Sequence, residues 1–464
     1  MADGEDEEKG GIMKSYELKP TDENLIDTYA SDSIGRNSDL HKFLDILDSI
    51  NENCSIAVDA QWGQGKTFFV KQAKLILDAF NEFSNLIDYD KKHRIKKIWS
   101  LHPSTELNRT LIPQYTVYFD AWENDNDEDP LLSLIYSIYT SIQTDYSFKE
   151  EINYADILSG IFELVTSKNI KWIFEQIQKK DILQPIRYQK ELLDKINEFF
   201  SAIFKEQGNR LVIFIDELDR CKPDFAVKLL ERIKHYFVNP DITFVFSINS
   251  MELQHTIKQY YGSEFDACKY LDRFFDLRIV LPDISTEKFL SSLGIEERYN
   301  YLDVIMRKVI NIYSFSMREI CKYIKMCNIA IGDGTNNNSD TSFFINSILV
   351  PLIIGLYIQN VTIYRLFVSG KDSLPLKQLI NSVTTDGRFK KILFSGKELM
   401  GKGHDDIPQA EIDKRIEEIY NAVFNYEFNK EPYITVGRFA IRRETKDLVK
   451  RVAGMLSIIA NVNI

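Results

Sequence analysis

A glycine-rich turn between an apolar run and a helical pattern is the feature that most constrains this chain. Residues 55–59 form a β-rich run, glycines follow at Gly63 and Gly65, and residues 67–80 carry apolar side chains at helical spacing. A strand, a glycine loop and a helix in this order are typical of a phosphate-binding loop. Glycines let the backbone wrap around phosphates, and the helix N-terminus offers free N–H groups and a positive dipole end. The segment therefore predicts an α/β fold with an anion site.

The loop pattern G-x-x-x-x-G-K-[ST] predicts roles for individual residues. Ala60 stands where the first glycine is expected, so the strict motif fails at one position and its second half is intact. Lys66 is expected to neutralise the β- and γ-phosphates of ATP, and the Thr67 hydroxyl to hold Mg²⁺. The other loop residues that we expect to contact the nucleotide are Gly63, Gln64, Gly65 and Phe68.

A second buried strand ends in two acids. Residues 211–215 are five consecutive apolar residues, followed by Asp216 and Glu217. We expect Asp216 to hold Mg²⁺, directly or through water, and Glu217 to orient or deprotonate the attacking water beside the γ-phosphate. The alternative, a strand capped by solvated acids, fits less well because the strand lies downstream of Gly-Lys-Thr. A helical insert at about 130–205 accounts for the long separation from the loop.

Four more polar residues are candidates for catalysis. Asn249 follows the next strand and could bond the attacking water or the γ-phosphate, but it could equally begin a loop. An arginine that reaches the transition state can accelerate phosphoryl transfer. Arg220, Arg273 and Arg318 are candidates, although each could instead form a structural or surface ion pair. We take Arg318 as the catalytic candidate.

The order of strands and helices predicts the organisation of the chain. Apolar strands alternate with helical patterns as far as about residue 284, which predicts right-handed βαβ crossovers and a parallel sheet. Helical patterns follow, without a convincing strand. We therefore expect a P-loop NTPase core with a long helical insert, then a helical lid and a C-terminal helical region. The predicted boundaries are 1–31 for a disordered tail, 32–284 for the core, 285–340 for the lid and 341–464 for the C-terminal region.

Composition and charge limit the partners and the compartment. The 464 residues carry a net charge of −12, so nucleic-acid binding is disfavoured, although a local basic patch would permit it. The acidic N-terminus has no apolar segment of a signal peptide. Five cysteines without a CxxC pair predict reduced thiols in the cytoplasm. The apolar run 343–358 is shorter than the roughly 20 residues that a bilayer span needs, which predicts a core helix pair and no membrane partner.

Several further motifs, in order along residues 32–325, make the chain resemble the KAP family of P-loop ATPases, within the AAA-related and STAND-related NTPases. Trp62 precedes the paired glycines, an aromatic strand with a tryptophan follows, and the acids precede a leucine-aspartate-arginine-cysteine tail. The matching segments are 34–36, 62–67, 118–123, 216–221, 270–275 and 316–320.

The resemblance implies an ATP-driven switch, because the family includes phage-exclusion proteins and signalling scaffolds. It also places Arg36 near the adenine pocket. Two departures stand out: Ala60 replaces a glycine, and the insert lacks the transmembrane helices that many family members carry. The leading hypothesis is a cytoplasmic ATPase that uses ATP and Mg²⁺ and acts as a homo-oligomer or with a partner protein. The alternative is a non-hydrolysing ATP sensor or scaffold that recruits a partner.

Overall fold

The structure is a computed structural model. It describes residues 18–102, 110–146, 154–175, 184–204, 210–295, 301–331, 339–383, 393–394, 407–425, 433–442, 449 and 452. The chain divides into two compact units, one spanning Lys19–Lys288 and the other starting at Phe289. The division lies four residues beyond the predicted end of the core at 284, and most of the predicted lid falls in the same unit as the C-terminal region.

The unit Lys19–Lys288, called the NTPase unit below, is built on a five-stranded parallel sheet. Its strands are β1 Cys54–Asp59, β2 Tyr115–Asp120, β3 Leu211–Asp216, β4 Ile242–Ile248 and β5 Leu277–Val280. They are ordered β2-β3-β4-β1-β5, and all neighbouring strands are parallel. Every residue of β3 and β4 is buried, as expected for central strands covered on both faces. The predicted α/β core with a parallel sheet is confirmed.

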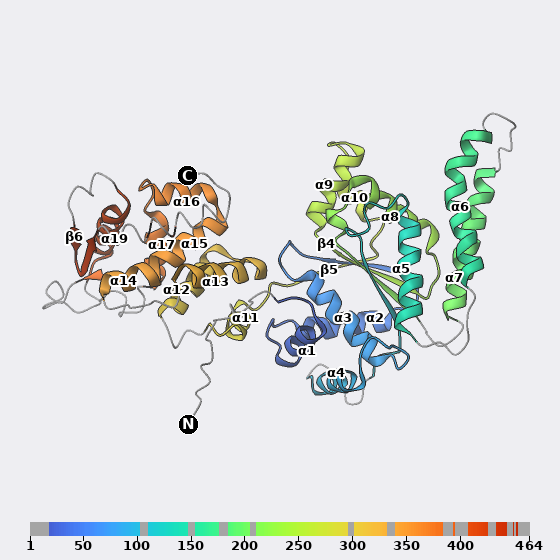
Figure 1. Ribbon diagram of the computed structural model, residues 1–464, viewed down its shortest axis with the longest axis horizontal. Helices are drawn as coiled ribbons and strands as arrows, with labels where there is room; N and C mark the ends of the chain where they lie inside the picture. The colour runs from blue at the N-terminus through green and yellow to red at the C-terminus, as the bar shows by residue number, and fades with distance from the viewer. Residues whose placement is uncertain are drawn as a thin grey trace, which may run out of the picture. The chain divides into compact units, whose positions relative to one another are not determined.

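Helices cover both faces of this sheet. Figure 1 shows α1 to α4 on one side of the strands and α8 to α10 on the other. The helices are α1 Asp22–Ser31, α2 Asn37–Ser49, α3 Lys66–Phe80, α4 Tyr89–Leu101, α5 Pro130–Asp145, α6 Tyr154–Glu175, α7 Gln184–Phe204, the 3₁₀ turn η1 Leu218–Arg220, α8 Pro223–Tyr236, α9 Ser250–Tyr261 and α10 Ala267–Leu271.

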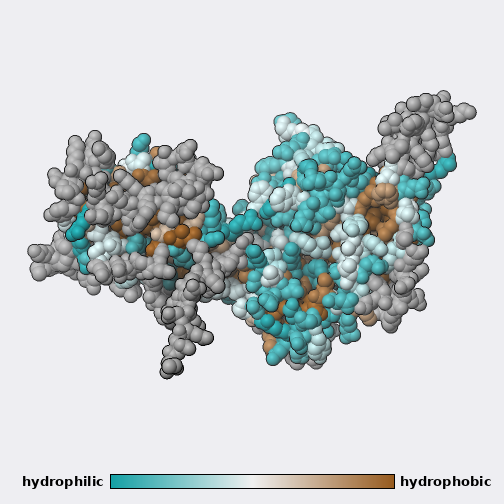
Figure 2. All heavy atoms as spheres, viewed as in Figure 1, coloured by the Kyte–Doolittle hydropathy of each residue, from teal (hydrophilic) through white to brown (hydrophobic). Residues whose placement is uncertain are grey.

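The helical insert packs on the same core as the sheet. Phe199 and Phe200 of α7 are fully buried. The Phe200 ring lies tilted against Phe237, which in turn contacts Phe244 of β4 edge-on. The row of aromatic rings continues along β4 to Phe246. On the face of the NTPase unit that Figure 2 shows, most residues are hydrophilic, and an apolar patch is visible near α5 and the α6–α7 pair. The insert is therefore part of the globular unit.

The second unit is mainly helical, as the sequence predicts, with one small exception. Its elements include α11 Thr286–Ser292, which straddles the division, α12 Tyr301–Tyr313, α13 Met317–Ile331, α14 Asp340–Phe344, the π-helical η2 Ile345–Leu349, α15 Val350–Gln359, α16 Val361–Val368, α17 Leu374–Val383, α19 Gln409–Phe424, β6 Tyr433–Val436 and β7 Phe439–Arg442. The hairpin β6–β7 corrects the prediction of a wholly helical C-terminal region. Gly437, with φ of 58°, supplies the left-handed residue of its turn.

The apolar run in this unit is longer than expected. In the part of the chain that the structure describes, Asp340–Gln359 is a single helical run of 20 residues with a mean hydropathy of 1.9 in its most apolar window, so the prediction that it is too short to span a bilayer is wrong. It is also one continuous run and not a helix pair, because α14, η2 and α15 follow one another directly. That window is 72% buried inside the protein, as in the core helix of a globular unit.

The N-terminal prediction also needs correction. The segment 1–31 was expected to be a disordered tail, but Asp22–Ser31 form α1. Thr21 caps this helix, and Leu25, Ile26 and Tyr29 are buried. The helix is stabilised by this apolar stripe, which the acidic residues before it obscure in the sequence.

Candidate functional site

The phosphate loop runs from the end of β1 to the start of α3, as predicted. Gly63 and Gly65 adopt φ values of 80° and 79°, in the left-handed region that favours glycine. Ala60 has no positive φ, and its N–H donates to the Ile248 carbonyl oxygen (3.2 Å), which extends the pairing of β1 with β4. An alanine fits this position because the backbone there is still strand-like, which explains the departure from the strict motif.

Lys66 is the first residue of α3, and its side chain turns back into the loop. Its Nζ donates to the carbonyl oxygens of Ala60 (2.8 Å) and Gln61 (3.3 Å). Burial lowers the pKa of the ammonium group, while the nearby carboxylates, led by Asp219 and Asp216, oppose that shift. Lys66 is thus a buried cation, held by neutral carbonyl oxygens, at the start of a helix whose N-terminus attracts anions.

Arg36 connects the phosphate loop to the segment that leaves the sheet. Its guanidinium donates to the Gln64 carbonyl oxygen (2.7 Å) and to the Pro282 carbonyl oxygen. It is 5% exposed, and burial lowers its pKa to about 10, against the opposing charges of Asp39 and Asp283. Arg36 therefore lies beside the phosphate loop, and its place near an adenine pocket remains a prediction.

The same segment is attached to the start of α2 and to β1. Gly35 has φ of 76°, and the Ser285 N–H donates to the Ile34 carbonyl oxygen (3.1 Å). The Leu281 N–H donates to the Asp59 carbonyl oxygen (2.9 Å), at the last residue of β1. These bonds hold residues 281–285 against the flank of the phosphate loop.

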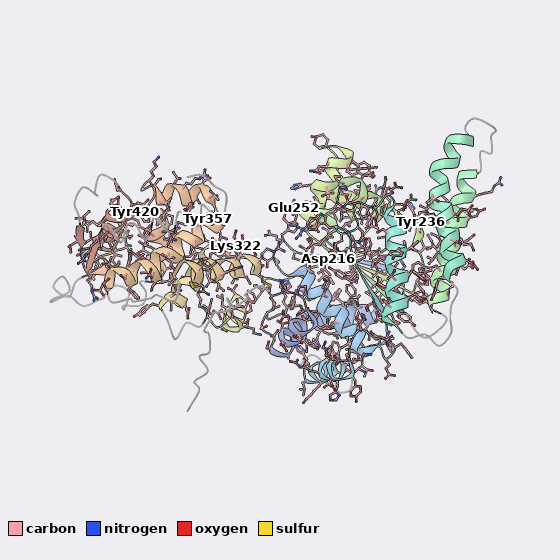
Figure 3. The ribbon with its side chains drawn as sticks, in the orientation of Figure 1. Asp216, Tyr236, Glu252, Lys322, Tyr357 and Tyr420 are labelled. Atoms are coloured by element: carbon pink, nitrogen blue, oxygen red, sulfur yellow. The ribbon has the colours of Figure 1, made fainter. Side chains whose placement is uncertain are left out.

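Asp216 ends β3 at the same edge of the sheet, where Figure 3 labels it. It is 1% exposed, and its Oδ2 accepts the Tyr118 hydroxyl (2.8 Å) while its Oδ1 accepts the Glu217 N–H (2.9 Å). Burial and then Asp216 raise the pKa of the Tyr118 phenol, so the phenol remains a donor. Two donors therefore orient this carboxylate.

Glu217 follows directly and adopts φ of 59°, a left-handed conformation that is uncommon outside glycine. Its Oε2 forms an ion pair with the Arg220 Nε, at a distance of 2.6 Å. Burial raises the pKa of Glu217 to about 7, and the Asp216 charge adds to this effect while Arg220 opposes it. Backbone strain of this kind clusters at functional sites, and the role of Glu217 as the water-orienting carboxylate remains a prediction.

Two tryptophans and a further acid surround this pair. The Arg220 guanidinium lies 5.8 Å from the Trp62 ring centroid and 5.5 Å from that of Trp122. The Trp62 indole N–H donates to Asp219, whose pKa burial raises against the opposing effects of this bond and of Lys66. The sequence shows these residues as motif letters without contacts. Their contacts depend on the turn η1 folding back toward the loop.

The remaining candidates lie in different places. Asn249 follows β4, is buried, and its Oδ1 caps α9 by accepting the N–H groups of Met251 (3.2 Å) and Glu252 (3.4 Å). Thr67 is half-buried in the first turn of α3, and Phe68 beside it is buried. Arg273 is exposed after α10 in the NTPase unit. Arg318 is exposed on α13 in the second unit, so its catalytic role remains a prediction.

The donor set suits Mg²⁺ shared with a nucleotide. Among the residues that the structure describes, no group of three or more His, Cys, Asp or Glu side chains could hold a metal ion by itself. Mg²⁺ does not require one, because it prefers oxygen ligands, keeps several waters and binds through one or two protein groups plus substrate phosphates. The Thr67 hydroxyl and the oriented Asp216 carboxylate are oxygen donors of this kind.

The left-handed glycine loop, the helix that begins at Lys66 and the acids at the end of β3 together define a P-loop NTPase. The chain belongs to the KAP family, because the family model described as the KAP family P-loop domain matches residues 36–331. This confirms the family suggested by the sequence motifs and makes the protein a nucleotide-binding protein.

Other comparisons add little. No curated protein matches the chain. Among solved structures, the Aeropyrum pernix ORC2 protein, in a structure titled as its ADPNP-ADP complexes, is similar at 11% sequence identity with a TM-score of 0.33. The match covers 83% of this chain and 94% of that chain. A likeness this weak says nothing about the chemistry of the present site.

Proposed function

We propose that the protein is an ATPase that binds ATP with Mg²⁺ and hydrolyses it as a conformational switch. The observation that carries this proposal is the pairing of a buried lysine with an acidic strand end at one edge of the sheet. The carboxylates of Asp219, Asp216, Glu217 and Asp59 each raise the pKa of Lys66 by charge attraction. The lysine of the loop and the acids after β3 are therefore close enough to bind one nucleotide together. A P-loop NTPase needs this combination: a cation for phosphate and carboxylates for Mg²⁺ and water.

The proposed roles follow from the positions of the groups. Lys66 and the N–H groups at the start of α3 bind the phosphates, with Gly63, Gln64, Gly65 and Phe68 shaping the loop and Arg36 beside it. Thr67 and Asp216 would hold Mg²⁺, which neutralises phosphate charge when bound. Glu217 would orient the attacking water and accept its proton. Asn249 and Arg318 are retained as further candidate groups in catalysis.

The biological setting is part of the proposal. The KAP family includes phage-exclusion proteins and signalling scaffolds, so we place the switch in defence or signalling, with a second copy or another protein as its partner. Net charge −12 disfavours nucleic acid as that partner. The cysteine composition and the burial of the apolar run Asp340–Gln359 support a cytoplasmic location without a membrane partner.

Turnover and binding, measured together, test the proposal. Lys66→Ala is expected to abolish ATP binding, because the buried cation is lost, and Glu217→Gln to retain binding but stop phosphate release. Lys228→Ala is a matched control, since Lys228 forms an exposed ion pair with Asp224 on α8. Chelation of Mg²⁺ by EDTA should abolish turnover of the unmodified protein.

The same measurements separate the two hypotheses. ATP binding without turnover by the unmodified protein would favour the non-hydrolysing sensor or scaffold. Full turnover by the Glu217→Gln protein would refute the role of Glu217. Affinity purification of the Glu217→Gln protein in the presence of ATP would then identify the oligomeric state and the partner.

A further inference from the structure

Arg220 makes a short contact with the carboxylate that we place in catalysis. It is the last residue of η1, three residues after Glu217, and its Nε lies 2.6 Å from Glu217 Oε2. The two side chains are 25% and 18% exposed, so water screens the pair only in part. The attraction within an ion pair this close restricts where the Glu217 carboxylate can lie.

The guanidinium is itself held by aromatic rings from two distant segments. Trp62 belongs to the phosphate loop, and Trp122 follows β2. Their ring centroids lie 5.8 Å and 5.5 Å from the guanidinium carbon, within the range of cation–π attraction. We call Trp62, Trp122 and Arg220 the tryptophan–arginine cage. The cage connects the phosphate loop to Glu217 through side chains alone.

The Trp62 ring is also held by a hydrogen bond. Its indole N–H donates to Asp219, a neighbour of Arg220 in η1. Trp62 is nevertheless 45% exposed and Trp122 51% exposed, which is unusual for such large apolar side chains. Burial in a core therefore does not explain their positions, whereas contact with the guanidinium does.

The surrounding charges favour a cation at this place. Asp120, Asp216 and Asp219 all act on Glu217 with like charge. Lys66 is directed toward the phosphate loop, where its Nζ bonds loop carbonyl oxygens. Arg220 supplies a positive charge that offsets the repulsion between the Glu217 carboxylate and these acids. Its attraction therefore favours the observed position of that carboxylate.

We propose that Arg220 is a positioning residue for ATP hydrolysis, which holds the Glu217 carboxylate toward the attacking water and is itself positioned by Trp62 of the phosphate loop. This inference rests on the proposed ATPase function. It implies that a change in the conformation of the phosphate loop on nucleotide binding would change the position of Glu217 through the cage.

Site-directed variants of the full chain test this role. Arg220→Gln is expected to lower kcat by roughly 10- to 100-fold, the loss typical of a misplaced catalytic group, with the Kd for ATP unchanged. Arg220→Lys should recover part of the rate, because charge returns without the planar group. Trp62→Leu should also lower kcat, whereas Trp62→Phe, which keeps an aromatic face, should lower it less.

Arg232→Gln is the matched control. Arg232 is also 25% exposed, lies over an aromatic ring (5.6 Å to Tyr236, labelled in Figure 3) and pairs with a carboxylate (Asp129, 3.3 Å), but at the far end of α8. It should leave kcat unchanged. In the Glu217→Gln background, where turnover is expected to stop, Arg220→Gln should leave the Kd for ATP unchanged, because Arg220 acts through Glu217. Weaker ATP binding by the double variant than by Glu217→Gln would show that Arg220 binds nucleotide, and would overturn the positioning role.

A readout without nucleotide separates the cage from catalysis. Arg220→Gln should increase acrylamide quenching of tryptophan fluorescence in the free protein, because it removes the group that covers Trp62 and Trp122. Arg232→Gln should not change the quenching. If Arg220→Gln and the unmodified protein were quenched equally, the cage would be overturned. An active unmodified protein whose Arg220→Gln variant matches it, or exceeds it, would overturn the role of Arg220 alone. An unmodified protein without turnover would overturn the proposed function and this role together. If Arg220→Gln does not fold, Arg220→Lys and Trp62→Leu decide.

Discussion

Replacing Tyr118 by phenylalanine isolates one hydrogen bond at the acidic end of β3. The Tyr118 hydroxyl donates to Asp216 Oδ2 at 2.8 Å, and Asp216 is 1% exposed, so water cannot easily take over. A hydrogen bond to a charged group contributes about 1.5–3 kcal/mol. The variant should therefore lose about 2 kcal/mol of unfolding free energy. For a unit of this size that corresponds to a fall of roughly 4–8 °C in Tm.

The same change should affect Mg²⁺ more than ATP. Loss of a group that orients a metal ligand commonly weakens metal binding by about 10- to 100-fold. We expect the Mg²⁺ concentration for half-maximal turnover to rise by roughly tenfold or more, while ATP binding without Mg²⁺ stays unchanged.

A second tyrosine provides the control for this experiment. Tyr261→Phe removes a tyrosine–carboxylate bond to Glu231 (3.0 Å) on an exposed part of the same unit, and should change Tm by less than about 1 °C. Calorimetry and a Mg²⁺ titration of turnover suffice for both variants. An unchanged Tm and Mg²⁺ requirement in Tyr118→Phe, or an equal effect of Tyr261→Phe, would show that Asp216 does not depend on this donor.

Two further predictions concern the flanks of the site. Gly35→Ala should lower the unfolding free energy of the NTPase unit by about 2–4 kcal/mol in a denaturation assay, because φ is 76° and an added Cβ would lie 2.7 Å from Ser285 Cβ. Gly262→Ala is the control. Its φ is 108° and the space around it is open, so it should show the backbone cost alone in the same assay. Burial and then His102 lower the pKa of His41 to about 3, so below about pH 6.5 the unfolded chain takes a proton that the folded chain excludes. Stability should fall as pH drops from 6.5 toward 3, by up to about 1.4 kcal/mol per pH unit, and denaturation of His41→Gln at pH 7 and pH 5 should show a smaller difference; an equal one would contradict the assignment.

Local signals made the chemical core of the site predictable. The phosphate loop depends on glycines at left-handed positions and on a helix start at Lys66, and each is visible over a few residues. β3 was predictable because a parallel strand between two others is buried on both faces and so requires a continuous apolar run. Five apolar residues form that run, and the two acids mark its end. The small α1 had the same kind of signal, a Thr21 cap and an apolar stripe, but its acidic surroundings pointed to a tail.

Contacts between distant segments were not predictable. Tyr118 reaches Asp216 only because β2 and β3 are paired with Asp120 opposite Asp216, which places Tyr118 two residues before the strand end. The sequence does not state that register. Asn249 illustrates a different case. The sequence left a loop-starting residue and a catalytic group equally open, and the structure shows its Oδ1 capping α9, which neither alternative named. The hairpin β6–β7 has strands of four residues, too short for alternation to be read.

The strand order has a consequence for how the chain is made. β1 ends at Asp59, but its neighbours β4 and β5 begin at Ile242 and Leu277, so the strand that carries the phosphate loop is synthesised long before anything can pair with it. Such non-local pairing slows folding and leaves apolar strands exposed during synthesis. A ribosome-bound chain that has not yet been extended to β4 cannot form the central sheet around the loop. Truncated chains that end before β4 should therefore depend on chaperones and fail to bind nucleotide.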